Sequence, residues 1–452
     1  MAEFPFQLLI KRASSQDKEE SLLCTDLLRA VPGKRAIYDA MWKDTNVIVK
    51  VFSHKIKAKL HFKRELKGLN QLQKRGLRSV VPLFWGETDD GRRVVVLEKI
   101  VDSATVLDVM SETVDKRSKL DLFVRVCREL AKQHSKGVLQ KDLHLENFLL
   151  ADDQLYSIDP SQMVFLPDQV SRKKSISQLA LLALNLPDSD VQWTRIVYEE
   201  YFKARGWNLE KSDETLIQQQ VTFLREEGIR RGLKKCLRTS TKFLRIRNDR
   251  TVAVLDRDFC RGADPLDFIG KIDMLMDKGQ VMKNGNTCYV SRLTWNGEDV
   301  VVKRYNHKGF VHSLRHTIKR SRARGGWLHA HRLGMLKVST PKPLAYIERR
   351  KGPLIWKSYL VTQYTGGQKL YDFLRDENVT QEQQLATTQQ VKNLLDEMGK
   401  HRITHGDFKN SNILISPTGP VLIDLDGMKV HRWDWSYKAQ KAKDLKRLAK
   451  EK

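Results

Sequence analysis

The sequence predicts an α+β fold made of two copies of one unit in tandem. Near residue 140 the chain reads HSKGVLQKDLHLENFLLADDQLYSIDPSQ, and near residue 405 it reads MGKHRITHGDFKNSNILISPTGPVLIDLDG. Three polar residues of the first segment recur in the second at one offset of 265: Asp142, Asn147 and Asp159 match Asp407, Asn412 and Asp424. Upstream, Lys50 and Lys303 each follow a β-branched run, at an offset of 253. Four matching positions in the same order indicate an internal repeat.

The same order of elements surrounds both copies of this pattern. Short β-branched runs, VIVK at 47–50 and VVVK at 300–303, predict strands that carry the lysines. Residues 59–75 have leucines at helical spacing among charged residues and predict a helix. Further strands are predicted at 94–100 and 354–364, and further helices at 118–136 and 381–400. Each copy therefore reads as strands, a helix, strands, a helix and a polar loop.

Domain boundaries follow from the positions of the two copies. A basic stretch ends the first copy, and the second set of elements starts some twenty residues later. We expect a first unit over residues 1–245, a linker over 246–265 and a second unit over 266–452 whose C-terminal part is short. A chain of 452 residues suits two such units.

Composition restricts the partners and the compartment. Lys and Arg number 81 against 55 Asp and Glu, a formal net charge of +26, which favours nucleic acid, an anionic membrane surface or phosphorylated substrates. The five cysteines are scattered without a C-x-x-C pair, as is typical of reduced, intracellular proteins. The most apolar stretch, residues 179–186, is too short to span a bilayer, and the N-terminus is a poor secretion signal. We expect a cytoplasmic protein, free or peripheral on a membrane.

The repeated residues form the polar set of a protein-kinase-like active site. In such a site the loop aspartate accepts the proton of the attacking hydroxyl. The asparagine and the second aspartate hold Mg²⁺ against the nucleotide phosphates, and the strand lysine neutralises phosphate charge. Taken singly, each residue has an ordinary explanation as a turn cap or a surface charge. Because the whole ordered set occurs twice, the sequence predicts two protein-kinase-like, bilobal domains that bind ATP and Mg²⁺.

Two motif pairs resemble a known family. HGDFKNSNILI with LIDLD, and QKDLHLENFLL with SIDPSQ, are similar to the bacterial lipopolysaccharide core kinases, which act on Kdo and heptose. The segment SRARGGWLHAHRLGMLKVSTPKPLAY at 321–346 is similar to that family's stretch between the strand lysine and the hinge. The resemblance implies ATP- and Mg²⁺-dependent phosphorylation of an inner-core sugar hydroxyl. It also implies lipopolysaccharide core or a lipid A–core precursor as partner, at the cytoplasmic face of the inner membrane.

The resemblance implies roles for individual residues. The catalytic bases would be Asp142 and Asp407, the metal ligands Asn147, Asp159, Asn412 and Asp424, and the nucleotide-binding residues Lys50, Glu65 and Lys303. Within this set, Glu65 lies fifteen residues after Lys50 and matches the helix glutamate that pairs with the strand lysine.

Both copies also depart from the kinase pattern. Gly325 or Gly326 stands at the glutamate's position in the second copy, so we expect the first copy to keep the more complete nucleotide clamp. Asp426 replaces the glycine of D-F-G and is either an additional metal ligand or a turn residue. The arginine of H-R-D is missing in both copies, and the glycine-rich turn is degenerate. These departures argue against a regulated protein kinase.

Two segments, 230–247 and 310–324, combine Lys and Arg with apolar residues at helical spacing. Basic amphipathic helices suit the anionic surface of the inner membrane. The alternative is a core-packing helix with an ordinary solvated face. Nucleic acid is disfavoured as a partner, because the sequence has no motif that reads it.

These observations predict a tandem kinase-fold enzyme that phosphorylates heptose or Kdo of the lipopolysaccharide inner core. Two alternatives remain open at this point. One is a kinase-fold phosphotransferase for another small molecule or for a protein. The other is a membrane-associated pseudokinase scaffold, which would bind nucleotide without turnover.

Overall fold

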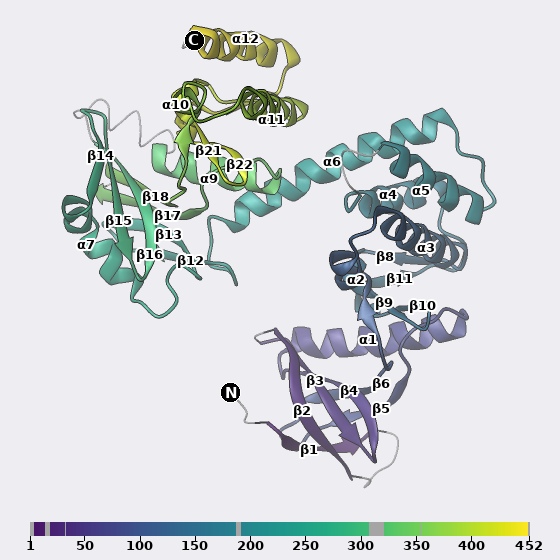
Figure 1. The fold of residues 1–452 in the computed structure, drawn as a ribbon. Coiled ribbons are helices and arrows are strands. Elements are labelled where there is room, and N and C mark those ends of the chain that lie inside the picture. Colours follow the sequence, from purple (N-terminus) through teal and green to yellow (C-terminus); the bar gives the residue numbers. More distant parts are fainter. Residues whose placement is uncertain are drawn as a thin grey trace. The chain divides into compact units, whose positions relative to one another are not determined.

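The computed structural model of the chain describes residues 4–13, 19–31, 33–186, 191–306, 321–352 and 354–450. It confirms the predicted mixed α+β class. The chain divides into two compact units, Met1–Arg225 and Glu226–Lys452 (Figure 1). Each unit has its own sheet followed by a mainly helical part.

The first unit begins with a closed barrel of antiparallel strands. In barrel order these are β1 (Phe6–Arg12), β2 (Glu19–Val31), β3 (Arg35–Trp42), β4 (Thr45–Phe52), β6 (Arg93–Glu98) and β5 (Pro82–Glu87). β4 contains the predicted VIVK strand and places Lys50 opposite Ile37 on β3 and Val95 on β6. The lysine is therefore fixed by the register of a central strand.

Helix α1 (Ile56–Lys74) follows β4 and packs against the barrel and the loop after β10. Ala58, Phe62, Leu69 and Leu72 form its buried stripe, at the spacing expected of an amphipathic helix. Glu65 lies in the middle of this stripe and is fully buried. A buried carboxylate on an otherwise apolar face requires a partner, which the site below supplies.

The rest of the first unit is mainly helical. Its helices are α2 (Val106–Glu112), α3 (Lys116–Ser135), α4 (Arg172–Ala183), α5 (Val191–Ala204) and the first part of α6 (Lys211–Lys235). Small antiparallel sheets join β7 (Ala104–Thr105), β9 (Phe148–Ala151) and β10 (Gln154–Ser157), and β8 (Val138–Gln140) with β11 (Met163–Phe165). Two 3₁₀ turns, η1 (Leu145–Asn147) and η2 (Pro160–Gln162), carry the polar motif.

The second unit contains an antiparallel sheet of seven strands. In sheet order these are β12 (Phe243–Arg247), β13 (Thr251–Asp256), β17 (Pro343–Lys351), β18 (Leu354–Gln363), β16 (Glu298–Tyr305), β15 (Cys288–Trp295) and β14 (Gln280–Asn284). α7 (Pro265–Lys278) covers one face, where its Phe268, Ile272 and Met276 are buried against the sheet (Figure 1). β16 places Lys303 opposite Val290 and Leu360.

The remaining elements of the second unit follow an order like that of the first. They are α9 (Arg322–Met335), β19 (Gln368–Lys369), α10 (Leu370–Phe373), α11 (Gln381–Lys400), β20 (Ile403–Thr404), η3 (Asn410–Asn412), β21 (Ile413–Ser416), β22 (Gly419–Leu422), η4 (Leu425–Gly427), β23 (Lys429–Val430) and α12 (Asp434–Lys450). Sheet β19-β21-β22 has the strand order of β7-β9-β10, and β20-β23 pairs as β8-β11 does.

The predicted linker is wrong in its secondary structure. Residues 246–265 contain β13 and the end of β12, and the buried Ala253 and Leu255 of β13 belong to the hydrophobic core that includes α7. The division of the chain falls at 225/226, inside α6, rather than near 245. Composition did not indicate this boundary, because residues 230–247 are rich in Lys and Arg. The segment nevertheless contains the end of α6 and the edge strand β12, and both pack apolar residues into the second unit.

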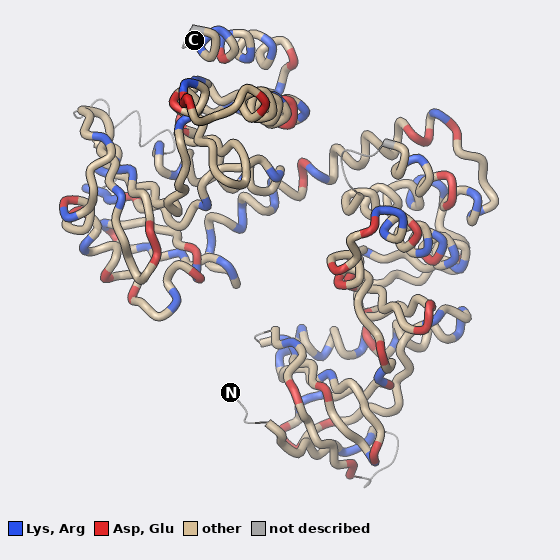
Figure 2. The backbone as a smooth tube through the Cα atoms, in the orientation of Figure 1, with Lys and Arg blue, Asp and Glu red and all other residues tan. Residues whose placement is uncertain are grey.

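The predicted amphipathic helix over 230–247 is also corrected. α6 ends at Lys235, and its apolar residues are occupied: Ile229 and Leu233 pack with Leu333 of α9 in the core of the second unit. This packing agrees with the alternative of a core-packing helix, and the basic residues of α6 in this segment, whose positions Figure 2 colours along the backbone, are exposed. Membrane binding through this segment stays a prediction. Residues 310–320 of the other basic segment lie outside the described residues, and 321–324 begin α9.

Within the described part of the chain, every helix is too short or too polar to cross a lipid bilayer.

Candidate functional site

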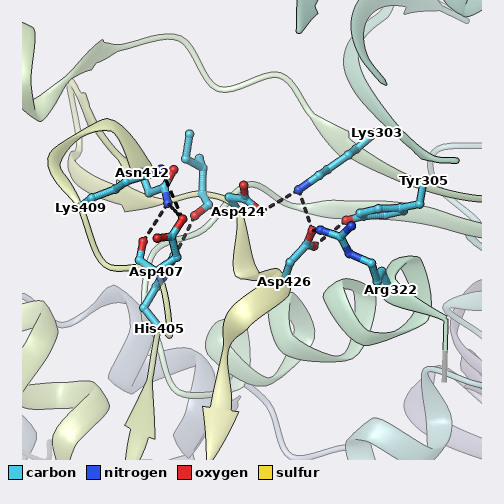
Figure 3. A network of polar contacts seen from close by, with 10 residues as sticks. Lys303, Tyr305, Arg322, His405, Asp407, Lys409, Asn412, Asp424 and Asp426 are labelled. Carbon is cyan, nitrogen blue, oxygen red and sulfur yellow. Dashed lines mark hydrogen bonds and ion pairs between the residues drawn. The ribbon is translucent and has the colours of Figure 1, made fainter. Parts of the chain in front are cut away.

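The strand lysine of the second unit meets two aspartates of the loop after β22 (Figure 3). Lys303 Nζ donates to Asp424 Oδ1 at 2.6 Å and to Asp426 Oδ2 at 2.9 Å. Burial alone would lower the pKa of Lys303, but Asp426 and Asp424 outweigh it, and the pKa is raised. In the same way, Lys303 outweighs the effect of burial on Asp424 and lowers the pKa of that carboxyl. Lys303 and Asp424 therefore form a charged pair at neutral pH.

The loop before β21 carries the other two repeated residues. Asn412 Nδ2 donates to the backbone carbonyl of Asp407 at 2.8 Å and to its Oδ2 at 3.3 Å. Lys409 Nζ lies 3.4 Å from the same carboxylate oxygen. His405 is buried and its Nε2 is hydrogen-bonded to the carbonyl of Ile423 at 2.9 Å. These contacts fix the loop against the segment that leads into Asp424 and hold Asp407 beside Asn412 (Figure 3).

Gly406 is the residue that lets this loop turn. Its φ is +82°, and a Cβ there would overlap the backbone carbonyl of Gly427. Its N–H donates to Asp444 on α12 at 2.9 Å, and its carbonyl accepts from Arg447. The position that carries arginine in protein kinases therefore requires glycine here.

Replacing Gly406 by alanine should lower the free energy of unfolding by about 2–4 kcal/mol, because left-handed strain and a backbone clash add. Chemical denaturation of the full chain measures this. Gly334→Ala, at an exposed position of α9 with open space around the glycine, is the matched control and should be neutral or slightly stabilising. A Gly406→Ala variant as stable as the Gly334→Ala variant would contradict the geometry.

The lysine of the first unit has partners of a different kind. Lys50 Nζ donates to Glu65 Oε1 at 2.6 Å and to Asp159 Oδ1 at 2.5 Å. Lys50 is 5% and Glu65 0% exposed, so this is a buried ion pair. Arg35 Nη2 donates to the second oxygen of Asp159 at 2.7 Å. Although burial acts in the opposite direction, Lys50 and Arg35 hold the pKa of Asp159 far below its usual range.

Asp142 and Asn147 lie as their counterparts do. Asn147 Nδ2 donates to the carbonyl of Asp142 at 2.6 Å. His144 stands where Lys409 stands in the second unit, with its Nε2 2.9 Å from Asp142 Oδ1. The loop side chains are more exposed than in the second unit: 64% of Asp142 is accessible, against 45% of Asp407.

The backbone around the two sites follows one pattern. In each unit the residue before the second aspartate donates its N–H to the carbonyl of the asparagine at 3.0 Å: Ile158 to Asn147, and Ile423 to Asn412. Asp159 and Asp424 both adopt left-handed φ values, 54° and 58°. Such a conformation is uncommon outside glycine and is frequent at functional sites.

The helix ends show which residue of α9 replaces Glu65. Leu77 N bonds to Leu72 O after α1, and Val338 N bonds to Leu333 O after α9 in the same way. With these ends matched, the counterpart of Glu65 is Gly326. Lys303 therefore has no glutamate on the helix, and Asp426 supplies a carboxylate instead, which spacing along the helix did not reveal.

Each set of residues borders a cavity within its own unit. In the second unit, Lys303, Asn412, Asp424 and Asp426 line a cavity of about 390 Å³ with apolar walls. The walls come from both parts of the unit: Val290, Val301, Leu360, Leu414 and Ile423. In the first unit, cavities of about 560 and 500 Å³ share Asn147 and Asp159. An apolar cavity beside a lysine and two aspartates is suited to bind a nucleotide.

The donor set fits Mg²⁺ better in the second unit than in the first. Among the residues described, no group of three or more His, Cys, Asp or Glu is placed to hold a metal. Mg²⁺ needs no such group, since it commonly takes one or two carboxylates and completes its shell with water and phosphate. Asp424 Oδ2 has no hydrogen-bond partner among the described residues, and Asn412 keeps its amide oxygen free. Both oxygens of Asp159 already have cationic partners.

The second unit is similar to a known protein family. Residues 273–452 match the model of the lipopolysaccharide kinase (Kdo/WaaP) family. The match covers 180 of 452 residues, all in the second unit, and it confirms for this part the resemblance seen in the sequence. The Kdo/WaaP family is a kinase family, which confirms the prediction of a kinase at that level. A search of curated proteins finds no match to the chain.

Three contributors were missed from the sequence. Tyr305 and Arg322 bind Asp426, and Arg35 binds Asp159. One signal was available: Tyr305 follows Lys303 by two residues on a strand, so both point to one face of the sheet. Arg35 and Arg322 carry no such signal, because their partners lie 124 and 104 residues away.

Proposed function

We propose that the chain is an ATP- and Mg²⁺-dependent kinase that phosphorylates a heptose or Kdo hydroxyl of the lipopolysaccharide inner core. One observation carries this proposal. The family match falls on the unit in which Lys303, Asn412 and Asp424 border one cavity, with Asp407 beside it. Family membership of this segment supplies the substrate class, and the donor set supplies the chemistry.

The proposed reaction follows from the positions of these groups. The acceptor hydroxyl oxygen attacks the γ-phosphorus of ATP, and Asp407 accepts the proton. The new P–O bond forms as the bond to the β,γ-bridging oxygen breaks, which yields ADP and a phosphate monoester. Lys303 balances charge on the nucleotide phosphates, and Lys409 brings a second cation beside Asp407.

Asp424 and Asn412 are the residues that would hold Mg²⁺. When bound, the ion neutralises phosphate charge and orients the transferred group. The free Oδ2 of Asp424 and the amide oxygen of Asn412 support this assignment. The fixed direction of the Asn412 amide, which donates to Asp407, leaves only its oxygen for a cation.

We further propose that the first unit is a second kinase-like domain with Asp142 as base, Asn147 and Asp159 as metal ligands, and Lys50 held by Glu65. The shared element order, the shared backbone hydrogen bonds and the left-handed aspartates support it. In this unit Arg35 has to leave Asp159 before a metal binds there. We therefore propose that the second unit carries most of the turnover.

The acceptor is tested with the full chain and three substrates. We expect ATP-dependent transfer to purified dephosphorylated core saccharide, and none to an aminoglycoside or to a general protein substrate such as casein. Mass spectrometry of the product should show one added phosphate on heptose or Kdo. The double variant Asp142→Ala with Asp407→Ala, which removes the proposed base of each unit, is the inactive control. Transfer to the aminoglycoside or to casein, but not to core saccharide, would reject the lipopolysaccharide assignment while leaving a kinase.

A further inference from the structure

Asp426 makes a set of contacts that are not explained by the two roles considered from the sequence, an additional metal ligand or a turn residue. Its Oδ2 accepts from Lys303 at 2.9 Å and from Arg322 at 2.7 Å, and its Oδ1 accepts from the Tyr305 hydroxyl at 2.6 Å. Figure 3 shows the four side chains converging from β16, the start of α9 and the turn η4. We propose that Asp426 is the positioning residue of the second unit, holding Lys303 as Glu65 holds Lys50 in the first. This inference rests on the proposed function of the site.

The second unit has no glutamate at the position of Glu65, and Asp426 supplies a carboxylate to Lys303 from the turn η4 instead. A Cβ on Gly326, the counterpart of Glu65, would lie 4.0 Å from Asp426 Oδ1 but only 2.8 Å from Leu360 Cδ2, so a side chain fits at this position only if Leu360 moves. In the first unit Ser161 stands at the position of Asp426, and the carboxylate is on the helix. The first unit therefore has its carboxylate on the helix, at Glu65, and a small residue in the turn, Ser161. The second unit has a glycine on the helix and its carboxylate in the turn, at Asp426.

The contacts of Asp426 also argue against the two roles considered from the sequence. Both oxygens of Asp426 already accept from Lys303, Arg322 and Tyr305, and a cation would have to compete there with two charged side chains, so these contacts favour a positioning role over a metal ligand. A simple turn residue would be solvated, whereas the Asp426 side chain is only 12% exposed. Asp424, which is 35% exposed, keeps the oxygen suited to a metal.

Tyr305 and Arg322 restrain Asp426 from two further directions. Burial and the neighbouring Asp426 raise the pKa of Tyr305 well above its usual value, so its hydroxyl stays a donor. Arg322 is the first residue of α9, and its guanidinium also lies 4.7 Å from the centre of the Tyr305 ring. With three donors on one carboxylate, Lys303 is directed to one place rather than sampling many rotamers.

The first test uses kinetics in an Asp142→Ala background, so that only the second unit turns over. Asp426→Asn should lower kcat/KM for ATP by about 10- to 100-fold, since it weakens one preorganised electrostatic contact. The Mg²⁺ concentration for half-maximal activity should stay unchanged, whereas Asp424→Asn should raise it. Asp396→Asn, an exposed acid on α11, is the matched control.

The results distinguish this inference from the proposed function. An unchanged kcat/KM in Asp426→Asn, or a raised Mg²⁺ requirement, would overturn the positioning role while the parent remains a kinase. If neither the wild type nor the Asp142→Ala parent transfers phosphate, the proposed function fails; if only the parent is inactive, the first unit is the catalyst. In both cases the pairing is tested by unfolding instead. Lys303→Met and Asp426→Asn should then each lower the unfolding midpoint, and the double variant should lower it by less than the sum. Additive shifts would overturn the pairing.

Discussion

Asp407→Ala should lower turnover by about 10²- to 10⁴-fold, the usual contribution of a positioned general base. Asp407 is held by Asn412 and Lys409, and both of these residues line the cavity that Lys303 and Asp424 also line. Alanine removes the proton acceptor and leaves the nucleotide contacts in place. We therefore expect kcat to fall while nucleotide affinity changes less than threefold. Steady-state kinetics with core saccharide, together with titration of a fluorescent nucleotide, measures both quantities.

Asp142→Ala is the matched variant in the first unit and should cost less. Asp142 is the more exposed of the two bases, and both oxygens of its neighbouring Asp159 are engaged by Lys50 and Arg35. The comparison ranks the two units directly. A larger loss in Asp142→Ala than in Asp407→Ala would show that the first unit is the main catalyst and would contradict the ranking.

Lys50→Met should destabilise the first unit by about 3–5 kcal/mol, because it leaves the Glu65 carboxylate buried without its cation. The cost is expected to be large here because the Glu65 side chain is fully buried, so that water cannot replace its lost partner. Hydrogen exchange of the α1 amides, read by mass spectrometry, measures the opening free energy of this region.

A double variant separates the buried charge from the lost packing. Lys50→Met with Glu65→Leu replaces the pair by apolar side chains and should recover most of the stability. Lys303→Met serves as the comparison in the second unit and should cost less, because Asp424 remains partly exposed. A Lys50→Met variant with α1 exchange like that of the wild type would show that the pair does not hold α1.

The elements that position the site were predictable because they obey local rules. The β-branched runs around Lys50 and Lys303 form β4 and β16, and α1 covers the leucine-rich segment 59–75. In each polar loop, a 3₁₀ turn that includes the asparagine leads directly into a short strand, so residues close together in the sequence also lie close together in the site. Their roles in catalysis and metal binding stay predictions.

What the sequence did not reveal depends on contacts between distant segments. Asp426 meets Tyr305 and Lys303 across more than 120 residues, and no spacing rule encodes such a meeting. The sequence shows both the glycine at the helix position, Gly326, and the additional acid, Asp426. That the acid replaces the helix glutamate became clear only from the structure, in which the two positions lie close together. The linker was misjudged for a related reason, because the short strands β12 and β13 acquire their role only by pairing into the larger sheet.

The most direct test of the central claim is calorimetric titration of the full chain with a non-hydrolysable ATP analogue in the presence of Mg²⁺. We expect saturable binding that weakens when Mg²⁺ is withheld, and the loss of one binding site per chain in Asp424→Asn. Asp396→Asn should bind as the wild type does. No heat of binding at millimolar analogue, or an isotherm unchanged by Asp424→Asn, would contradict a nucleotide site built on Lys303, Asn412 and Asp424.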